Sequence, residues 1–268
     1  MASQLIRQRA PTLGTIAAAS VGAGLFYRMM STNTAAAETV AKTAPPAKIF
    51  GSGPAFASLK LESSKMVNHN TKLLRFEFPN GDAVSGLKLT CEPGYLELMV
   101  KHYPSGKAST HLHSLQPGDS LRFVTAIPGY PWTPNKHSSV TLIAGGAGIT
   151  PIYQLVQGIL DNPEDKTKIT LVFGVNSDRD VLLQKEFDNY EKRFPGRFRA
   201  VYTVSNPENG SALRKGYVTR ELLEEVGGKG EKVFVCGPPA MEAALTGQRG
   251  KGGILAELGY SKDQVHKF

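Results

Sequence analysis

The sequence has few cysteines and lacks the patterns that mark several protein classes. Its 268 residues include only Cys91 and Cys236, which cannot make a disulfide framework and favour a reduced, intracellular environment. No cysteine or histidine spacing typical of zinc is present, and His111 and His113 are too close in sequence to share a helix face. The G-x-S-x-G nucleophile elbow and internal repeats are also absent. We therefore expect no metal site and no hydrolytic triad.

Acidic residues are outnumbered, with 23 Asp and Glu against 31 Lys and Arg, which gives a net charge of +8. Such a charge suits nucleic acid, an acidic membrane surface or an acidic protein partner. No aromatic RNA-binding motif and no dense basic run accompany it, so no nucleic-acid partner is expected. An acidic protein partner would be steered by the excess of Lys and Arg, at a rate that depends on ionic strength.

The first 37 residues contain no Asp or Glu but include three arginines. Between these arginines, Thr12–Tyr27 is an uncharged apolar run that falls just short of the ~17–25 residues of a membrane span. A basic, acid-free start followed by such a run is typical of a mitochondrial presequence that merges into an anchor. A cleaved secretory signal is the alternative, supported by Ala35–Ala37. We expect a targeting segment and membrane anchor over residues 1–30.

Composition and periodicity divide the rest of the chain into a linker and two domains. Residues 31–56 are rich in Ala, Thr, Ser and Pro, which predicts a flexible linker. Over residues 57–133, apolar and polar residues alternate, as in Leu74–Phe78, and this predicts antiparallel strands in a small barrel. Residues 137–268 alternate continuous apolar strands with helical stretches, which predicts a doubly wound parallel sheet. The expected strands are Val140–Ala144, Ile169–Phe173, Ala200–Val204 and Val233–Cys236, and the expected helices are Ile152–Leu160, Leu182–Phe194 and Arg220–Val226, the last capped by Thr219.

Two glycine-proline signatures each follow an apolar strand directly. Strands that stop in glycine and then open a helix place bare backbone at the carboxyl edge of a parallel sheet, where α/β proteins bind nucleotides. The two together predict a dinucleotide site, although Pro151 takes the last place of a full G-x-G-x-x-G motif. In plain helix chemistry, Thr150 and Pro151 would be an N-cap and a first-turn proline. The signatures are Gly145-Gly146-Ala147-Gly148-Ile149-Thr150-Pro151 and Cys236-Gly237-Pro238-Pro239-Ala240-Met241.

Two further segments carry candidate binding groups. Asp180 follows the strand Ile169–Phe173, where a carboxylate can hydrogen-bond adenosine ribose hydroxyls and favour NADH over NADPH. Asp178 is an alternative for this role, and a solvated loop carboxylate is the plain interpretation. The second segment is a turn that opens a helix, whose backbone N–H groups can hold phosphate oxygens; taken alone, it is an ordinary helix start capped by Ser109. This turn consists of Gly106, Lys107, Ala108, Ser109 and Thr110.

The order of these motifs resembles the ferredoxin-reductase superfamily, and within it the NADH-cytochrome b5 reductases. A barrel precedes Gly-Gly-x-Gly-x-Thr-Pro and Cys-Gly-Pro-Pro-x-Met, and the chain ends in Phe268. The resemblance covers residues 58–268 and implies an FAD-binding antiparallel β-barrel followed by an NADH-binding domain. Four segments are similar to the mitochondrial form from fungi: Ser109–Leu112, Tyr130–Trp132, Asn135–His137 and Gly259–Val265.

The resemblance also implies an activity. In that family NADH delivers a hydride to the flavin, and electrons then leave singly to the haem of cytochrome b5. The implied cofactors are FAD and NADH, and the implied partner is cytochrome b5 or a similar acidic haem protein. The expected location is the mitochondrial outer membrane or the intermembrane space. Two alternatives stay open: an NAD(H)-binding protein that has lost flavin and catalysis, and a related flavin reductase with another acceptor.

Site roles follow from the same resemblance. Thr150 would reach between flavin and nicotinamide, and Cys236 would pack against or orient the nicotinamide, although a lone cysteine is more often an inert core residue. Phe268 would lie near the flavin, with a frayed terminus as the alternative. The flavin would contact Lys101, Tyr103 and the turn Gly106–Thr110. NADH would bind across Gly145, Gly146, Gly148, Pro151, Asp180, Gly237, Pro238, Pro239 and Met241.

One motif of the family is missing from this chain. The family carries Arg-x-Tyr-Thr/Ser-Pro on a barrel strand, where it grips the FAD pyrophosphate and packs on the isoalloxazine. No Arg-x-Tyr occurs in the barrel region, and the stretch Thr90–Pro93 is interpreted as the junction left by a lost strand and its neighbours. The sequence therefore predicts a truncated barrel.

Overall fold

The structure is a computed structural model, and the described residues belong to the unit Pro45–Phe268. The anchor predicted over residues 1–30 and most of the predicted linker lie outside them. Within the described ranges, no helix is long and apolar enough to cross a membrane. The described residues are 45–51, 56–87, 92–124, 129–227, 230–248 and 251–268.

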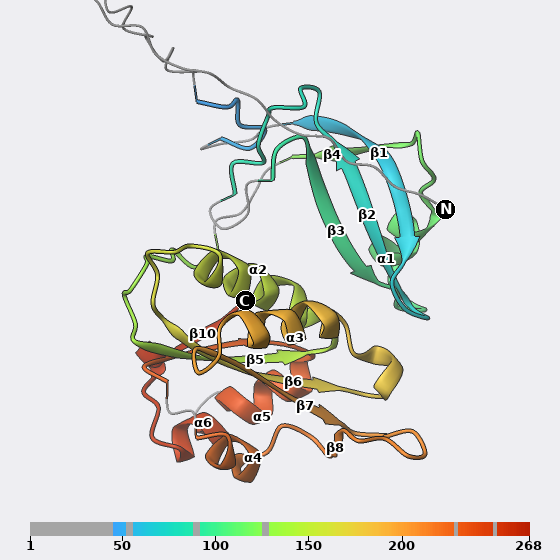
Figure 1. Cartoon of the computed structure of the whole chain (residues 1–268). Helices are drawn as coiled ribbons and strands as arrows, with labels where there is room; N and C mark the ends of the chain where they lie inside the picture. The colour runs from blue at the N-terminus through green and yellow to red at the C-terminus, as the bar shows by residue number, and fades with distance from the viewer. Residues whose placement is uncertain (1–44, 52–55, 88–91, 125–128, 228–229, 249–250) are drawn as a thin grey trace, which may run out of the picture. The chain divides into compact units, whose positions relative to one another are not determined.

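The first half of this unit is a four-stranded antiparallel sheet in the order β3-β2-β1-β4 (Figure 1). Leu74 and Phe76 of β2 are fully buried against Leu59 and Leu61 of β1, as the predicted alternation requires. Among the described residues, β3 and β4 each pair with one neighbour only, so the sheet stays open as a half-barrel. The strands are β1 (Ala57–Met66), β2 (Thr71–Glu77), β3 (Tyr95–Lys101) and β4 (Ser120–Phe123), with helix α1 (Lys107–Ser114) between the last two.

Part of the predicted linker is folded onto this sheet. Lys48 forms a parallel bridge with Val84, and the Phe50 N–H donates to the Ser85 carbonyl at 2.9 Å. The Phe50 ring is buried and its centroid lies 6.0 Å from that of Phe123. The prediction of a flexible linker is therefore wrong at Lys48–Phe50. Burial of one aromatic ring outweighs the disorder-prone composition of its neighbours.

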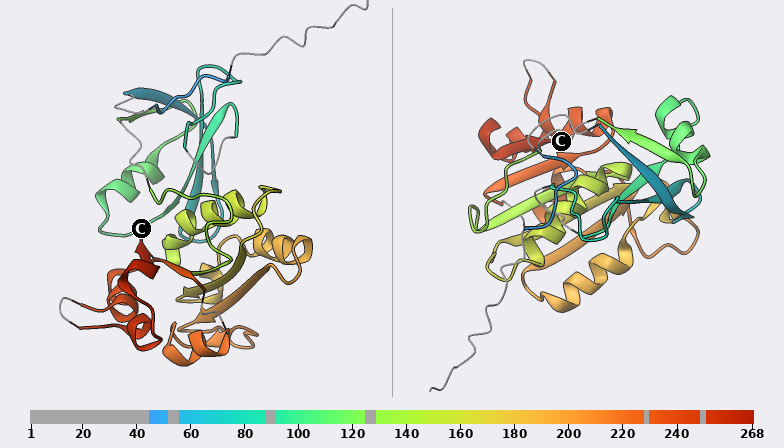
Figure 2. Two further views of the ribbon diagram at one scale, coloured as in Figure 1. Left: turned by 90° about the vertical axis from the view of Figure 1, so that its left-hand side faces the viewer. Right: turned by 90° about the horizontal axis from the view of Figure 1, so that it is seen from above.

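The second half is a six-stranded parallel sheet in the order β10-β9-β5-β6-β7-β8, which confirms the predicted doubly wound domain. Helices α2 and α3 cover one face of this sheet, and α4, α5 and α6 cover the other (Figures 1 and 2). The strands are β5 (Ser139–Gly145), β6 (Lys168–Val175), β7 (Phe198–Val204), β8 (Arg214–Lys215), β9 (Lys232–Cys236) and β10 (Val265–Lys267). The helices are α2 (Ile149–Leu160), α3 (Gln184–Arg193), α4 (Arg220–Glu225), α5 (Pro239–Thr246) and α6 (Ile254–Glu257).

The side chains of the central strands explain this layering. Leu142 and Ala144 of β5 pack on the α2 side, whereas Ile143 packs on the α4 side. Strands buried on both faces are apolar at nearly every position, which explains the nearly continuous apolar runs in the sequence. Thr141 is the polar exception in Val140–Ala144, and it is also buried. Thr219 caps α4 as predicted, because its side chain accepts a hydrogen bond from the Leu222 N–H.

Candidate functional site

The two glycine signatures meet at the point where the strand order reverses. Strands β5 and β9 are parallel neighbours, and Ala144 pairs with Cys236 at their carboxyl ends. From β5 the chain proceeds to β6, β7 and β8 on one side of the sheet, and later returns to β9 and β10 on the other. Open α/β sheets bind their ligands in the crevice at such a switch point. Both signatures therefore border one crevice.

Close packing between the two loops explains why glycines are needed there. A Cβ at Gly145 would lie 2.5 Å from Met241 Sδ and 2.7 Å from Pro238 Cδ. A Cβ at Gly148 would lie 2.2 Å from the Cys236 carbonyl oxygen. Gly146 differs, since its φ of +52° lies in the left-handed region and no atom lies within 4 Å of a Cβ built there. The loops thus form a cradle of bare backbone, which fits a dinucleotide.

The start of α2 differs from its prediction. A 3-10 turn, Gly146–Gly148, precedes the helix, so Gly148 is the N-cap. Thr150 is inside the first turn, where its hydroxyl donates to the Ala147 carbonyl at 3.1 Å. The predicted N-cap role of Thr150 is therefore wrong, whereas Pro151 does occupy the first turn. No acidic residue lies in that turn, but the Ile149 N–H already donates within the preceding 3-10 turn and Pro151 has no N–H.

The second loop ends in α5, whose first residue is Pro239. Proline suits this position because the first N–H groups of a helix have no partner within the helix. Cys236, just before this loop, is half-buried, and burial together with the nearby Glu242 carboxylate raises the pKa of its thiol. A protonated thiol is a poor nucleophile. The environment of Cys236 therefore agrees with a packing or orienting group rather than a covalent one.

The C-terminal residue is held in place. The Phe268 N–H donates to the Val235 carbonyl at 3.1 Å, which extends the pairing of β10 with β9. The Phe268 ring stacks on Phe234 with 6.1 Å between centroids and meets His266 edge-on at 5.1 Å. The alternative of a frayed terminus is therefore wrong. Its placement beside a flavin stays a prediction.

The turn before α1 is closed by a buried serine. Ser109 Oγ accepts a hydrogen bond from the Tyr103 N–H at 3.1 Å and lies 3.0 Å from the Gly106 carbonyl oxygen, to which it donates. Gly106 is the N-cap of α1, without a side-chain cap, so the predicted capping role of Ser109 is wrong. Ser109 is in the first turn of α1 instead, where its hydroxyl stabilises the loop between Tyr103 and Gly106. Lys107, Ala108 and Thr110 are exposed.

The helix start itself remains available to an anion. The first turn of α1 contains no acidic residue, and its leading N–H groups have no side-chain cap. Tyr103 lies two residues beyond the end of β3 rather than on the strand, and it is half-exposed. This turn fits one end of a flavin pyrophosphate, while the predicted second holder, an arginine on a neighbouring strand, is missing from the sequence.

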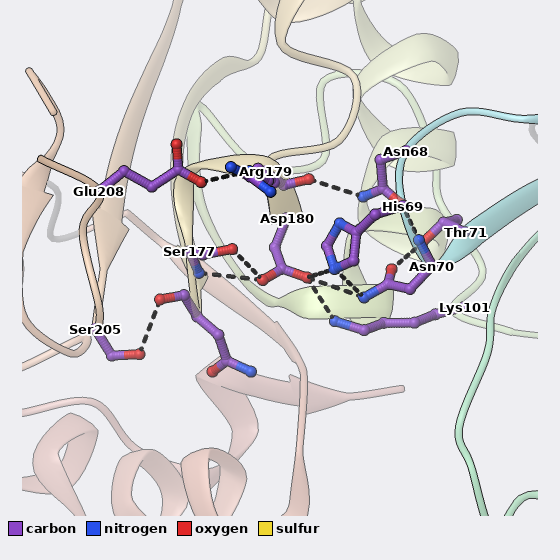
Figure 3. Close-up of polar contacts among 11 residues, drawn as sticks. Asn68, His69, Asn70, Thr71, Lys101, Ser177, Arg179, Asp180, Ser205 and Glu208 are labelled. Carbon is purple, nitrogen blue, oxygen red and sulfur yellow. Dashed lines mark hydrogen bonds and ion pairs between the residues drawn. The ribbon is translucent and has the colours of Figure 1, made fainter.

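Asp180 joins the two sheets (Figure 3). Its Oδ1 accepts hydrogen bonds from Lys101 Nζ at 3.0 Å and from Asn70 Nδ2 at 3.2 Å. Its Oδ2 accepts from the backbone N–H and the hydroxyl of Ser177 at 3.1 and 2.8 Å. The side chain is only 8% exposed, so the interpretation as a solvated loop carboxylate is wrong. A ribose hydroxyl reaching Asp180 has to replace one of these donors.

Several charges and dipoles set the protonation of this carboxylate. Burial by itself raises the pKa of Asp180, but the hydrogen bonds from Ser177 and Lys101, the Lys101 charge and the Asn70 amide together lower it below its ordinary value. Asp180 is therefore ionised at neutral pH. The alternative residue Asp178 is engaged elsewhere, because it accepts hydrogen bonds from the Glu208 N–H and the Ser211 hydroxyl.

Sequence reasoning missed the residues that hold Asp180 from the other sheet. Asn68 Nδ2 donates to the Arg179 carbonyl at 3.0 Å, and Asn70 reaches Asp180 itself. Both asparagines belong to the turn between β1 and β2, which a sequence pattern describes only as polar. The contact joins residues that are 110 positions apart, so no local signal identifies it.

A cavity of about 1030 Å³ lies between the outer face of β2 and β3 and helix α2. Thr150 lines it, but Tyr103, the Gly106–Thr110 turn and Cys236 do not. Four acidic side chains line it against two basic ones, and Arg75 and Arg193 pair with two of the acids. Among the described lining residues there is thus no excess of positive charge. The charged residues are Lys65, Glu92, Glu97, Asp161, Lys185 and Glu186.

Comparison with known proteins agrees with this two-part site. The Oxidoreductase NAD-binding domain matches residues 142–246, and the Oxidoreductase FAD-binding domain matches residues 87–128. The cytochrome b5 reductase domain of Ulva prolifera nitrate reductase has a similar fold, with a TM-score of 0.72 at 24% identity over 83% of this chain and all of that one.

Two curated relatives are more similar in sequence. NADH-cytochrome b5 reductase 2 of Emericella nidulans is 44% identical over 297 residues, covering 97% of this chain and 91% of the relative. NADH-cytochrome b5 reductase 2 of Aspergillus niger is 42% identical over 295 residues, covering 97% of this chain and 90% of the relative. The first alignment exceeds the 268 residues of this chain by 29, so at least 29 positions of that relative have no counterpart here. The chain belongs to the NADH-cytochrome b5 reductase family, oxidoreductases with FAD- and NAD-binding domains.

Proposed function

We propose that this protein passes electrons from NADH through FAD to the haem of cytochrome b5. The observation that carries the proposal is the cradle of bare backbone where β5 and β9 end at the switch point, within a chain that also matches an FAD-binding domain. Its relatives are named for reduction of cytochrome b5, which supports this acceptor. FAD accepts a hydride as an electron pair and releases electrons singly, as a one-electron haem requires.

In this proposal the NADH diphosphate lies on the cradle. The left-handed Gly146 presents its bare backbone to it, while Gly145 and Gly148 let the α5 loop approach. Thr150 lies in the first turn of α2 and Cys236 ends β9, on either side of this crevice, which supports their placement beside the nicotinamide. Asp180 favours NADH, because its negative charge repels a 2′-phosphate.

The flavin side of the site rests on the other sheet. The first turn of α1 holds one end of the FAD pyrophosphate with its uncapped N–H groups, and the exposed Tyr103 ring lies against the flavin. Phe268 approaches the same cofactor from the end of β10 in this proposal, whereas the Lys101 ammonium is held by Asp180 at 3.0 Å.

The partner and the location belong to the same proposal. The net charge of +8 suits an acidic haem protein, and the acid-free N-terminus suits an anchor in the mitochondrial outer membrane. Fractionation of mitochondria, with protease added before and after the outer membrane is opened, tests the location. Recovery in the soluble matrix contradicts it.

Reduction of purified cytochrome b5 tests the electron acceptor. With FAD and NADH supplied, the full chain is expected to reduce the haem, and the rate is expected to fall as ionic strength rises because steering is screened. NADPH is expected to support a slower rate. The variant Gly148→Ala is the matched control, because its added Cβ blocks the cradle. Flavin reduction without haem reduction would indicate another acceptor.

A further inference from the structure

The carboxylate of Asp180 has its acceptor positions filled by the protein itself. An ionised carboxylate offers about four lone-pair positions, two on each oxygen. Oδ1 accepts from Lys101 Nζ at 3.0 Å and from Asn70 Nδ2 at 3.2 Å, and Oδ2 accepts from the Ser177 N–H and hydroxyl at 3.1 and 2.8 Å (Figure 3). A ribose hydroxyl can therefore donate to Asp180 only by displacing one of these donors.

The two donors on Oδ2 are part of the turn that positions the carboxylate. Ser177 and Asp180 form a capping box around the 3-10 turn Asp178–Asp180, in which each side chain bonds the backbone of the other residue. Displacing Ser177 would undo both halves of this box and release the turn. A ligand that needs Asp180 in place therefore leaves Ser177 bound.

Lys101 is also held firmly. Its contact with Asp180 is a charge-assisted hydrogen bond, which is about twice as strong as a neutral one. The side chains of Lys101 and Asp180 are 16% and 8% exposed, so departure of the ammonium would leave a largely buried carboxylate without a cation. A neutral hydroxyl cannot compensate for that loss.

Asn70 is the donor that exchanges most readily. Its amide is neutral, and its contact with Asp180 is the longest of the four, at 3.2 Å. The same Nδ2 also lies 2.9 Å from His69 Nε2, so the amide keeps a partner after it leaves Asp180. A ribose hydroxyl is neutral as well and replaces the lost hydrogen bond with one of the same kind.

The turn between β1 and β2 carries Asn70 together with a second contact to the other sheet. Asn68 Nδ2 donates to the Arg179 carbonyl at 3.0 Å. The two asparagines are tied to each other, because the Asn70 N–H donates to Asn68 Oδ1 at 3.0 Å. The turn thus grips the backbone at Arg179 and the carboxylate at Asp180 as one unit.

We propose that the turn Asn68–Asn70 is a latch that occupies the ribose-binding carboxylate and leaves it when NADH binds. This inference rests on the proposed function, because it uses Asp180 as the ligand of the adenosine ribose. The ribose hydroxyl takes the place of the Asn70 amide on Oδ1, while Lys101 and Ser177 stay. The latch lowers the affinity for the nucleotide, and by linkage the bound nucleotide weakens the contact between the two sheets.

Calorimetric titration of the full chain with NAD⁺ tests the latch. Asn70→Ala is expected to bind NAD⁺ about 5-fold more tightly, because no amide has to be displaced. Asn68→Ala loosens the same turn and is expected to tighten binding about 2-fold. Asn80→Ala is the matched control, since this exposed asparagine lies in another turn of the same sheet and accepts from the Asp82 N–H at 2.9 Å. Damage to the fold weakens binding, so it does not imitate a gain.

An NAD⁺ analogue whose adenosine ribose lacks both hydroxyls assigns the gain to Asp180. The parent protein and Asn70→Ala are expected to bind this analogue equally, because it cannot compete with the amide. Equal or weaker binding of NAD⁺ by Asn70→Ala overturns the inference, and so does a gain that persists with the analogue.

These titrations also separate the inference from the proposed function. They require neither flavin nor haem, so a chain that shows the gain but never reduces cytochrome b5 contradicts the proposed function and leaves the latch in place. A parent protein that binds NAD⁺ and gains nothing from Asn70→Ala overturns the latch alone. Failure of the parent and of every variant to bind NAD⁺ contradicts both.

Discussion

Lys101 Nζ lies 3.0 Å from Asp180 Oδ1, and this ion pair joins β3 of the antiparallel sheet to the turn after β6 of the parallel sheet. The two side chains are only 16% and 8% exposed. His69 lies 3.9 Å from the same oxygen and Asn70 donates to it. Because a largely buried carboxylate needs both a cation and hydrogen bonds, the flavin half of the molecule supplies what the nucleotide half needs.

Removal of the Lys101 charge is expected to destabilise the fold. Lys101→Met leaves Asp180 buried without its cation, and we expect the free energy of unfolding to fall by about 3 kcal/mol. Urea unfolding measures this change. The control is Lys60→Met, which removes an exposed ion pair with Glu77 and is expected to change stability by less than about 0.5 kcal/mol. Equal losses in the two variants would contradict a special role for the Lys101–Asp180 pair.

The stabilisation by Asp180 is expected to depend on pH. Its folded-state pKa lies below its ordinary value, so its contribution is fully present above the unfolded pKa of about 3.9 and is lost as pH falls through the lower folded value. Asp180→Asn should therefore be less stable than the parent protein near neutral pH, by about 2 kcal/mol, and the difference should shrink below about pH 4. Asp188→Asn, an exposed carboxylate on α3, is the control. A difference that does not change with pH contradicts the assignment.

Three glycine substitutions separate packing from backbone conformation. Gly148→Ala places a Cβ 2.2 Å from the Cys236 carbonyl oxygen. We therefore expect the free energy of unfolding to fall by about 3 kcal/mol and NAD⁺ binding to be lost. The Cβ of Gly146→Ala meets no atom, but the residue must keep a left-handed φ. We therefore expect its free energy of unfolding to fall by about 1 kcal/mol. Gly81→Ala has neither constraint and should be neutral. Thermal unfolding and calorimetry with NAD⁺ measure all three, and an unchanged Gly148→Ala rules out the loop contact.

Cys236 is expected to react slowly with alkylating reagents at neutral pH. Burial and Glu242 raise the pKa of its thiol above the ordinary cysteine value, so the reactive thiolate is scarce at neutral pH. Mass spectrometry of a Cys91→Ser protein treated with iodoacetamide measures the rate. NAD⁺ should protect the thiol, because the residue ends the strand at the cradle. Fast labelling at neutral pH would instead identify an activated cysteine.

The elements that the sequence predicts best are those whose signal is local. Val140–Ala144 is apolar except for the buried Thr141, because both faces of β5 are covered, and Gly145 and Gly148 are needed because loops touch there. Ser109 and Thr150 are predicted as N-caps, but each lies in the first turn of its helix. The observed N-caps are Gly106 and Gly148, because each helix begins earlier than its sequence pattern indicates. Such shifts depend on backbone hydrogen bonds that side-chain patterns do not report.

Contacts between distant segments are what the sequence does not predict. Phe50 packs beside Phe123, and Lys101 meets Asp180 across 79 positions. Nothing near Asp180 in the sequence distinguishes a carboxylate that faces solvent from one that receives a lysine from another sheet. The open edge of β3 was predictable, because the sequence lacks the motif of a neighbouring strand.

The visible absorption spectrum of the full chain, incubated with FAD and titrated with NADH without oxygen, tests the central claim most directly. An NADH-dependent reductase predicts that the flavin band bleaches, with one NADH consumed per flavin, and that the band returns when oxidised cytochrome b5 is added. A protein that binds NAD⁺ but leaves the flavin band unchanged would contradict the account.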